Sequence, residues 1–181
     1  MANKTTPARA ACRFKPSESI EIWELISGEF SAVIKKLPSE GGSHYAEEVL
    51  TISHATQLEV IAHCLSCVPE EACGLLIGDY ASEVVDHVVP TENVAHSAMV
   101  YTVDPGAFLA ADRAAAKQGF DVIGVYHSHT HTEAYPSPTD VSQAPDPGWH
   151  YVLVSLRDIV PVFRSYSIVE GTVTEELVVT Q

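Results

Sequence analysis

Long apolar segments and basic residues are scarce in this chain of 181 residues. No apolar run approaches the roughly 18–20 residues that a membrane-spanning helix needs, and residues 1–19 lack the apolar stretch of a signal peptide. Ten Lys and Arg stand against 24 Asp and Glu, a formal net charge of −14. Because nucleic acids and anionic membranes attract clustered positive charge, neither partner is expected. Four cysteines without a signal segment favour a cytoplasmic location.

The remaining composition is that of a folded protein. Hydrophobic residues make up 46% of the chain and charged residues 19%, a balance typical of globular rather than disordered proteins. The length suffices for one domain with a substantial core and a short extension.

Charge and linker composition divide the chain near residue 45. Residues 1–45 hold six of the ten basic residues and five of the 24 acidic ones, and they end in the Gly/Ser-containing segment 38–43. We therefore expect an N-terminal extension over 1–45 and a functional domain over 46–181. Apolar residues recur at helix-like spacing between 20 and 34. An amphipathic helix there could dock on the domain or on a second copy of the chain, which leaves a homodimer open.

Residues 46–181 alternate between strand and helix patterns. This alternation predicts an α/β layered domain, and the closing run of strands predicts a mixed sheet. The expected helices are 53–67, capped by Ser53, and 104–118, opened by Asp104-Pro105 and ended by Gly119. The expected strands are 48–52, 73–78, 83–89, 98–103, 121–127, 150–155, 160–169 and 173–179.

The residues most suggestive of chemistry follow the strand at 121–127. His127 and His129 are two residues apart, so a strand places both imidazoles on one face. Asp140 follows after a loop that contains Pro136 and Pro138 and can fold back over the strand end. Two imidazoles and a carboxylate are ligands of the catalytic zinc type, with the fourth position left to water.

Plainer interpretations stand beside this one. A histidine pair at a strand end is often only a surface feature. Ser137, Pro138 and Asp140 also suit a helix N-terminus, with Ser at the cap and Asp three residues later. The two interpretations are compatible, because a helical turn holds a carboxylate rigidly. His131 is a third imidazole nearby, and we interpret it as a bystander.

The pattern His127-x-His129-x7-Ser137-x2-Asp140, with Glu71-Ala-Cys-Gly upstream, resembles the JAMM (MPN+) zinc metalloprotease family. The resemblance covers nearly all of 46–181. Its stretches 69–78, 126–140, 150–158 and 164–176 look closest to the bacterial Mec branch. It implies the JAMM/MPN layered fold, similar to that of cytidine deaminases, with a central mixed β-sheet flanked by helices.

The resemblance also implies roles at five positions. His127, His129 and Asp140 match the ligands of one zinc ion per chain. Glu71 matches the acid–base glutamate, which would accept the proton of the attacking water and deliver it to the leaving amine. Ser137 matches the serine that donates a hydrogen bond to the developing oxyanion. Glu70 is then a solvated neighbour.

The Mec branch hydrolyses the bond between a ubiquitin-like sulfur-carrier protein and a C-terminal cysteine. The resemblance therefore implies a zinc peptidase that acts on a small β-grasp carrier in cysteine or thio-metabolite synthesis, either releasing cysteine or trimming residues after Gly-Gly. A deubiquitinase-like isopeptidase is one alternative, although nine residues between Asp140 and His150 leave no room for the large insertion of eukaryotic relatives. A non-catalytic MPN scaffold is the other, which the intact set of site residues disfavours. Neither a nucleobase-deaminase signature nor a nucleotide-binding fingerprint is present.

Overall fold

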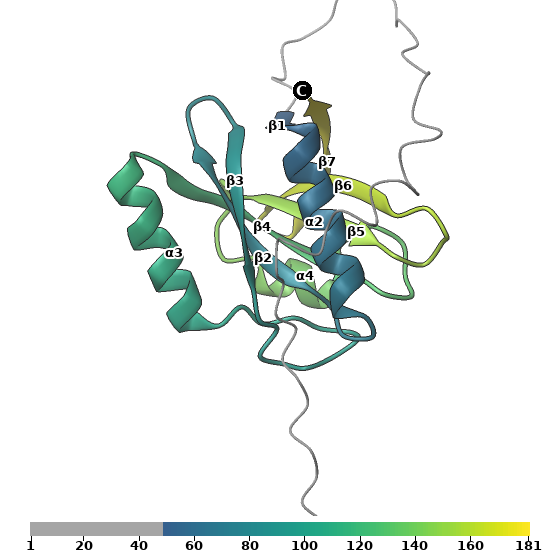
Figure 1. Ribbon diagram of the computed structural model, residues 1–181. Coiled ribbons are helices and arrows are strands. Elements are labelled where there is room, and N and C mark those ends of the chain that lie inside the picture. Colours follow the sequence, from purple (N-terminus) through teal and green to yellow (C-terminus); the bar gives the residue numbers. More distant parts are fainter. Residues whose placement is uncertain (1–48) are drawn as a thin grey trace, which may run out of the picture. The chain divides into compact units, whose positions relative to one another are not determined.

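The computed structural model describes residues 49–181 (Figure 1). The expected extension over 1–45 lies outside the described residues, so the boundary at residue 45 stays a prediction. The strands are β1 (Val49–Ile52), β2 (Cys73–Asp79), β3 (Val84–Thr91), β4 (Asp121–His129), β5 (His150–Ser155), β6 (Val162–Val169) and β7 (Thr172–Thr180). The helices are α2 (His54–Cys67), α3 (Pro105–Gln118) and α4 (Pro138–Gln143).

The strands form one closed, mixed sheet in the order β1-β3-β2-β4-β5-β6-β7. It closes because β1 pairs in parallel with both β3 and β7. Strands β4 and β5 are also parallel, and the other neighbours run antiparallel. The expected α/β fold with a mixed sheet and flanking helices is confirmed; the closure of the sheet is an addition that the strand patterns did not reveal.

The long helices pack on opposite faces of the sheet at β2 and β4 (Figure 1). Val60 and Cys64 of α2 pack in a core cluster with Leu76. Ala111 of α3 packs in another cluster with Leu75, the neighbour of Leu76 along β2. Successive strand residues point to opposite faces, so β2 contributes to both layers and is buried over almost its whole length.

The helix starts lie where the capping signals predicted them. Ser53 Oγ accepts a hydrogen bond from the Thr56 backbone N–H (3.0 Å), and Asp104 Oδ1 accepts one from Ala107 (2.7 Å). Gly119 ends α3 with φ 80°, a left-handed conformation that glycine adopts without steric cost. These local signals confirm α2 and α3.

The strand expected over 98–103 is wrong. Within the described part of the chain, this segment contributes a single isolated bridge, between Asn93 and Val103. The Asn93 side chain accounts for the difference, because it donates to the carbonyl of Val100 (3.1 Å) and accepts from the backbone N–H of Thr102 (3.0 Å). A side chain that bonds the backbone in this way replaces the partner strand that a ladder would require.

Over residues 49–181, no helix combines the length and the apolar character needed to cross a membrane.

Candidate metal centre

The two histidines singled out in the sequence lie at the end of β4, on one face of the sheet. His127 and His129 are 1% and 5% exposed, and their Nε2 atoms are 3.2 Å apart. Tyr126 and Ser128 point the other way: the Tyr126 hydroxyl lies 2.9 Å from His63 Nδ1 of α2, and Ser128 Oγ accepts from a backbone N–H in the segment before β2 (2.9 Å). The two-residue period of the strand thus brings both imidazoles together.

Asp140 reaches the histidines from the first turn of α4. Ser137 and Asp140 form a capping box, in which Ser137 Oγ accepts from the Asp140 N–H (3.2 Å) and Asp140 Oδ2 accepts from the Ser137 N–H (2.6 Å). The same Oδ2 atom lies 3.5 Å from Nε2 of His127 and 3.5 Å from Nε2 of His129. The cap therefore holds the carboxylate at the point where the two imidazoles converge.

The geometry of these three side chains fits a zinc ion. Among residues 49–181 they form the one group of three or more His, Cys, Asp or Glu side chains whose ligand atoms all lie within 4.8 Å of one another. A tetrahedral zinc ion with bonds of roughly 2.0–2.2 Å holds its ligand atoms about 3.3–3.6 Å apart. The separations of 3.2, 3.5 and 3.5 Å match these edges. Three protein ligands leave one position open, as catalytic zinc sites do.

The two imidazoles are held in different ways. His129 Nδ1 lies 2.8 Å from the carbonyl oxygen of Glu133, and donation to that carbonyl leaves the Nε2 lone pair free for a metal, the usual arrangement of ligating histidines. His127 Nδ1 is buried and has no hydrogen-bond partner. Instead, the ring of Tyr101 stacks on the His127 ring, with centroids 4.2 Å apart and planes inclined by 22°.

The surroundings favour the metal-binding forms of His127 and Asp140 and act in the opposite sense on His129. Burial lowers the pKa of His127, which favours the neutral imidazole. Burial alone would raise the pKa of Asp140, but hydrogen bonds with His127 and His129 hold it well below its usual range. For His129, burial lowers the pKa and the hydrogen bond with Asp140 raises it, with a net rise.

Glu71 lies beside this cluster without belonging to it. The residue is 5% exposed and stands just before β2. Its backbone is fixed at both ends, because its N–H donates to the carbonyl of Ser97 (2.8 Å) and its carbonyl accepts from Asn93 Nδ2 (3.0 Å). The pKa of Glu71 is raised to about 7, mainly by burial; the nearby His129 opposes the rise and the negative charge of Asp140 adds to it. A buried carboxyl that gains and loses a proton near neutral pH suits acid–base chemistry.

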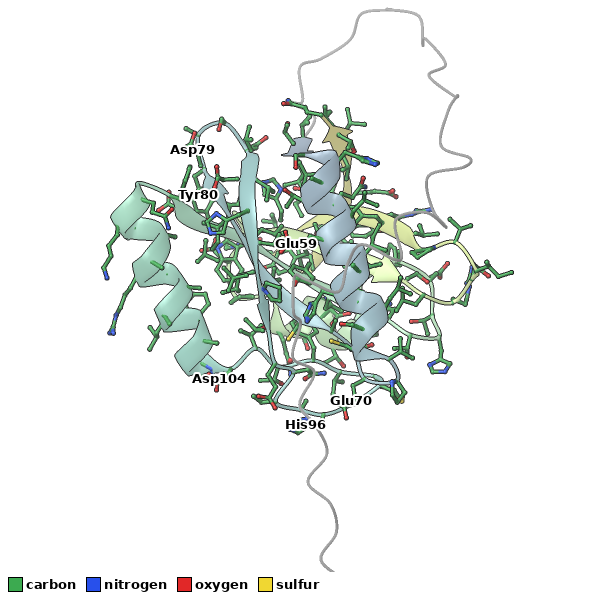
Figure 2. The ribbon with its side chains drawn as sticks, in the orientation of Figure 1. Glu59, Glu70, Asp79, Tyr80, His96 and Asp104 are labelled. Carbon is green, nitrogen blue, oxygen red and sulfur yellow. The ribbon has the colours of Figure 1, made fainter. Side chains whose placement is uncertain are left out.

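The two neighbours interpreted as bystanders lie outside the cluster. His131 is exposed, with Nδ1 2.6 Å from Thr130 Oγ1. Glu70 faces away toward His96, whose Nδ1 lies 3.4 Å from Glu70 Oε2 (Figure 2). Neither belongs to the cluster of His127, His129 and Asp140.

Three residues of the site escaped the sequence analysis. Asn93 and Ser128 hold the segment that carries Glu71, and the ring of Tyr101 stacks on that of His127. Tyr101 fell inside the strand expected over 98–103. No motif marks any of the three, because their roles depend on contacts between segments far apart in the chain.

The sequence is similar to a known protein family and to characterised relatives. Residues 53–169 match the family described as prokaryotic homologs of the JAB domain. The chain is 45% identical over 118 residues to the CysO-cysteine peptidase of Mycobacterium tuberculosis, covering 65% of this chain and 81% of that protein. It is 38% identical over 88 residues to the desampylase of Haloferax volcanii, covering 48% and 63% of the two chains.

A solved structure shares the fold. The solution structure of a protein from Desulfitobacterium hafniense superposes with a TM-score of 0.68 and 33% identity, covering 73% of this chain and 92% of that one.

Proposed function

This chain belongs to the JAMM/MPN family, among the prokaryotic homologs of the JAB domain, and we propose that it is a zinc-dependent peptidase that cleaves an amide bond at the C-terminus of a ubiquitin-like sulfur-carrier protein. The observation that carries the proposal is the convergence of His127, His129 and Asp140 beside the buried Glu71. The relatives named CysO-cysteine peptidase and desampylase support a peptidase that acts on small protein conjugates.

His127, His129 and Asp140 would hold the metal. When bound, zinc supplies Lewis acidity, which polarises a scissile carbonyl and makes water acidic enough to react near neutral pH. Glu71 accepts the proton that the attacking water loses and returns it to the leaving amine. Its pKa of about 7 suits both steps, since a group that titrates near the working pH can take up and release a proton at comparable cost.

Ser137 is the proposed donor to the negative charge that develops on the carbonyl oxygen. Its Oγ accepts the capping hydrogen bond from Asp140, so the hydroxyl proton is left to donate elsewhere. A donor aimed at an oxyanion contributes about 2.7–4 kcal/mol in other hydrolases. Because Ser137 and Asp140 share one helical turn, the distance between the proposed donor and the proposed metal ligand is fixed by the backbone.

An apolar depression beside this turn supports a protein substrate. Its volume is about 720 Å³, and side chains on both sides of Ser137 line it, among them Tyr135, Pro136, Pro138 and Val141. Tyr135 is 52% exposed. Exposed apolar surface beside the turn that carries Ser137 and Asp140 suits the docking of a folded partner.

Cleavage of an isopeptide conjugate is the second candidate. The relative named desampylase favours it. The connection between α4 and β5 spans only residues 144–149, which offers little surface for a second protein on the leaving side. We therefore favour release of a short tail or a single amino acid.

The test measures the intact mass of a sulfur carrier that ends in an extra cysteine, before and after incubation with the zinc-loaded protein. We expect loss of one cysteine residue, abolished by a chelator and by Glu71→Gln. Glu70→Gln is the matched control, because Glu70 is adjacent in sequence but faces His96, and it should keep full turnover.

The outcomes separate the candidates. Cleavage of a lysine-linked carrier conjugate, with the cysteine-tailed carrier left intact, would establish the isopeptidase instead. A protein that binds one zinc ion and cleaves neither substrate would contradict the proposed function.

A further inference from the structure

The two histidine ligands differ in what orients their rings. The His129 ring is fixed through Nδ1, which lies 2.8 Å from the carbonyl of Glu133. His127 Nδ1 is buried without a hydrogen-bond partner. A ligating histidine normally donates from its second nitrogen to an acceptor that fixes ring orientation and tautomer. Some other contact must hold the His127 ring in its ligating position.

Tyr101 supplies that contact. Its ring lies nearly parallel to the His127 ring, with centroids 4.2 Å apart and an interplanar angle of 22°. A ring stacked at this distance blocks rotation of the imidazole about its Cβ–Cγ bond, because a turned ring would collide with the tyrosine face. The contact between Tyr101 and His127 is made by the two rings.

Tyr101 is itself held by Asn93. The buried Asn93 side chain donates to the carbonyl of Val100 (3.1 Å) and accepts from the N–H of Thr102 (3.0 Å), the residues on either side of Tyr101. Its amide nitrogen also donates to the carbonyl of Glu71 (3.0 Å). One asparagine thus fixes the backbone on which both the stacked ring and the proposed general base stand.

We propose that Tyr101 is a positioning residue of the metal centre, whose stacked ring orients His127 in place of the missing hydrogen bond and thereby sets the affinity for zinc. The inference rests on the proposed function, since it requires that His127 bind a metal. It assigns a role to the loop between β3 and α3, which no motif in the sequence marks.

The test compares zinc dissociation constants, measured on purified full-length protein by competition with a chromophoric chelator. Tyr101→Phe keeps the ring and should bind zinc within about threefold of wild type. Tyr101→Leu keeps apolar bulk without a ring and should bind about 10–100-fold more weakly, the range typical of lost supporting contacts at metal sites.

Tyr80→Leu is the matched control. Figure 2 shows Tyr80 at the opposite end of the described domain from His96 and Asp104, which flank the loop that carries Tyr101. Tyr80 is 41% exposed, and its replacement should leave the zinc affinity unchanged. Should Tyr101→Leu fail to fold, Tyr101→Met replaces it, because a flexible thioether fills the space without a ring face.

A second measurement follows the ring directly. In the metal-free protein, the ¹⁵N signals of the His127 imidazole should show one ring orientation in wild type and Tyr101→Phe, and exchange between orientations in the ringless variant. His129, held by Glu133, should not change.

Equal zinc affinity of a folded ringless variant and wild type would overturn the proposal, and so would a loss in Tyr101→Phe as large as that in Tyr101→Leu. Failure of the wild-type protein to bind zinc at all is a different result, since it removes the metal centre and the proposed function with it.

Discussion

Replacement of Glu71 by glutamine should abolish turnover, keep zinc and stabilise the metal-free protein. Glutamine has the shape of glutamate but cannot accept a proton from water near neutral pH. General acid–base catalysis contributes about 10²–10⁴-fold to rate, so turnover should fall by at least about 100-fold. Zinc should remain, because Glu71 lies outside the cluster formed by His127, His129 and Asp140.

The effect on stability follows from burial. The folded chain raises the pKa of Glu71 from 4.5 to about 7, mainly through burial; His129 opposes the rise and the charge of Asp140 adds to it. The folded state therefore holds this proton more tightly than the unfolded state, and the free energy of unfolding falls as the pH rises from 4.5 through about 7. The full change amounts to about 3 kcal/mol. Glutamine, neutral throughout, avoids this loss, so the variant should gain up to about 3 kcal/mol at pH 8 and almost nothing at pH 4.5.

Three measurements check the reasoning. Intact-mass analysis of the carrier reports turnover, elemental analysis after gel filtration reports zinc per chain, and denaturant unfolding in a chelator at several pH values reports stability. Loss of zinc from Glu71→Gln would make Glu71 a ligand rather than a base. Full turnover with zinc bound would refute its role in proton transfer. An unfolding free energy that differs from wild type by the same amount at pH 4.5 and pH 8 would refute the burial argument.

Three further variants test the surrounding turn and surface. Asp140→Asn keeps an amide oxygen that can accept from the Ser137 N–H, so α4 should persist by circular dichroism, while the neutral ligand lowers zinc content well below one ion per chain. Ser137→Ala should lower kcat about 100-fold or more, because the oxyanion donor is lost, and should lower the free energy of unfolding by about 1 kcal/mol, because the cap is lost. Ser137→Thr retains a hydroxyl that can donate and cap, so it should keep most of the wild-type kcat and stability. Tyr135→Ser, at an exposed position of the apolar depression, should raise KM for the carrier about tenfold with kcat unchanged, and an unchanged KM would show that the carrier docks elsewhere.

The N-terminal ends of the helices were predictable because their signals are local. A cap requires a short side chain that reaches a backbone N–H two or three residues ahead, and Ser53, Asp104 and Ser137 do so. The alternation of β4, which places His127 and His129 on one face, is equally local. The sequence could not show whether Ser137 and Asp140 form a helix cap, part of a metal centre, or both. In the structure, Asp140 Oδ2 accepts the capping hydrogen bond from Ser137 and also lies 3.5 Å from Nε2 of both histidines.

Closure of the sheet and the surroundings of the histidines depended on tertiary structure. The pattern at 98–103 predicts a strand, yet the side chain of Asn93 bonds the backbone there, and the segment forms a loop that stacks Tyr101 on His127. An alternating pattern indicates which side chains are buried. It does not indicate whether the backbone N–H and C=O groups will bond to a neighbouring strand or to a side chain.

By itself, the sequence determined the α/β pattern, the helix caps, the paired histidines and the family resemblance that singled out Glu71 and Ser137. Only the tertiary structure decided what surrounds those residues. Glu71 lies more than fifty positions before the histidines, and its raised pKa arises from burial and from charges on other elements. Desolvation and through-space electrostatics depend on distances that chain folding creates, and so does the ring contact at His127, whereas caps and strand periodicity depend on neighbours along the chain.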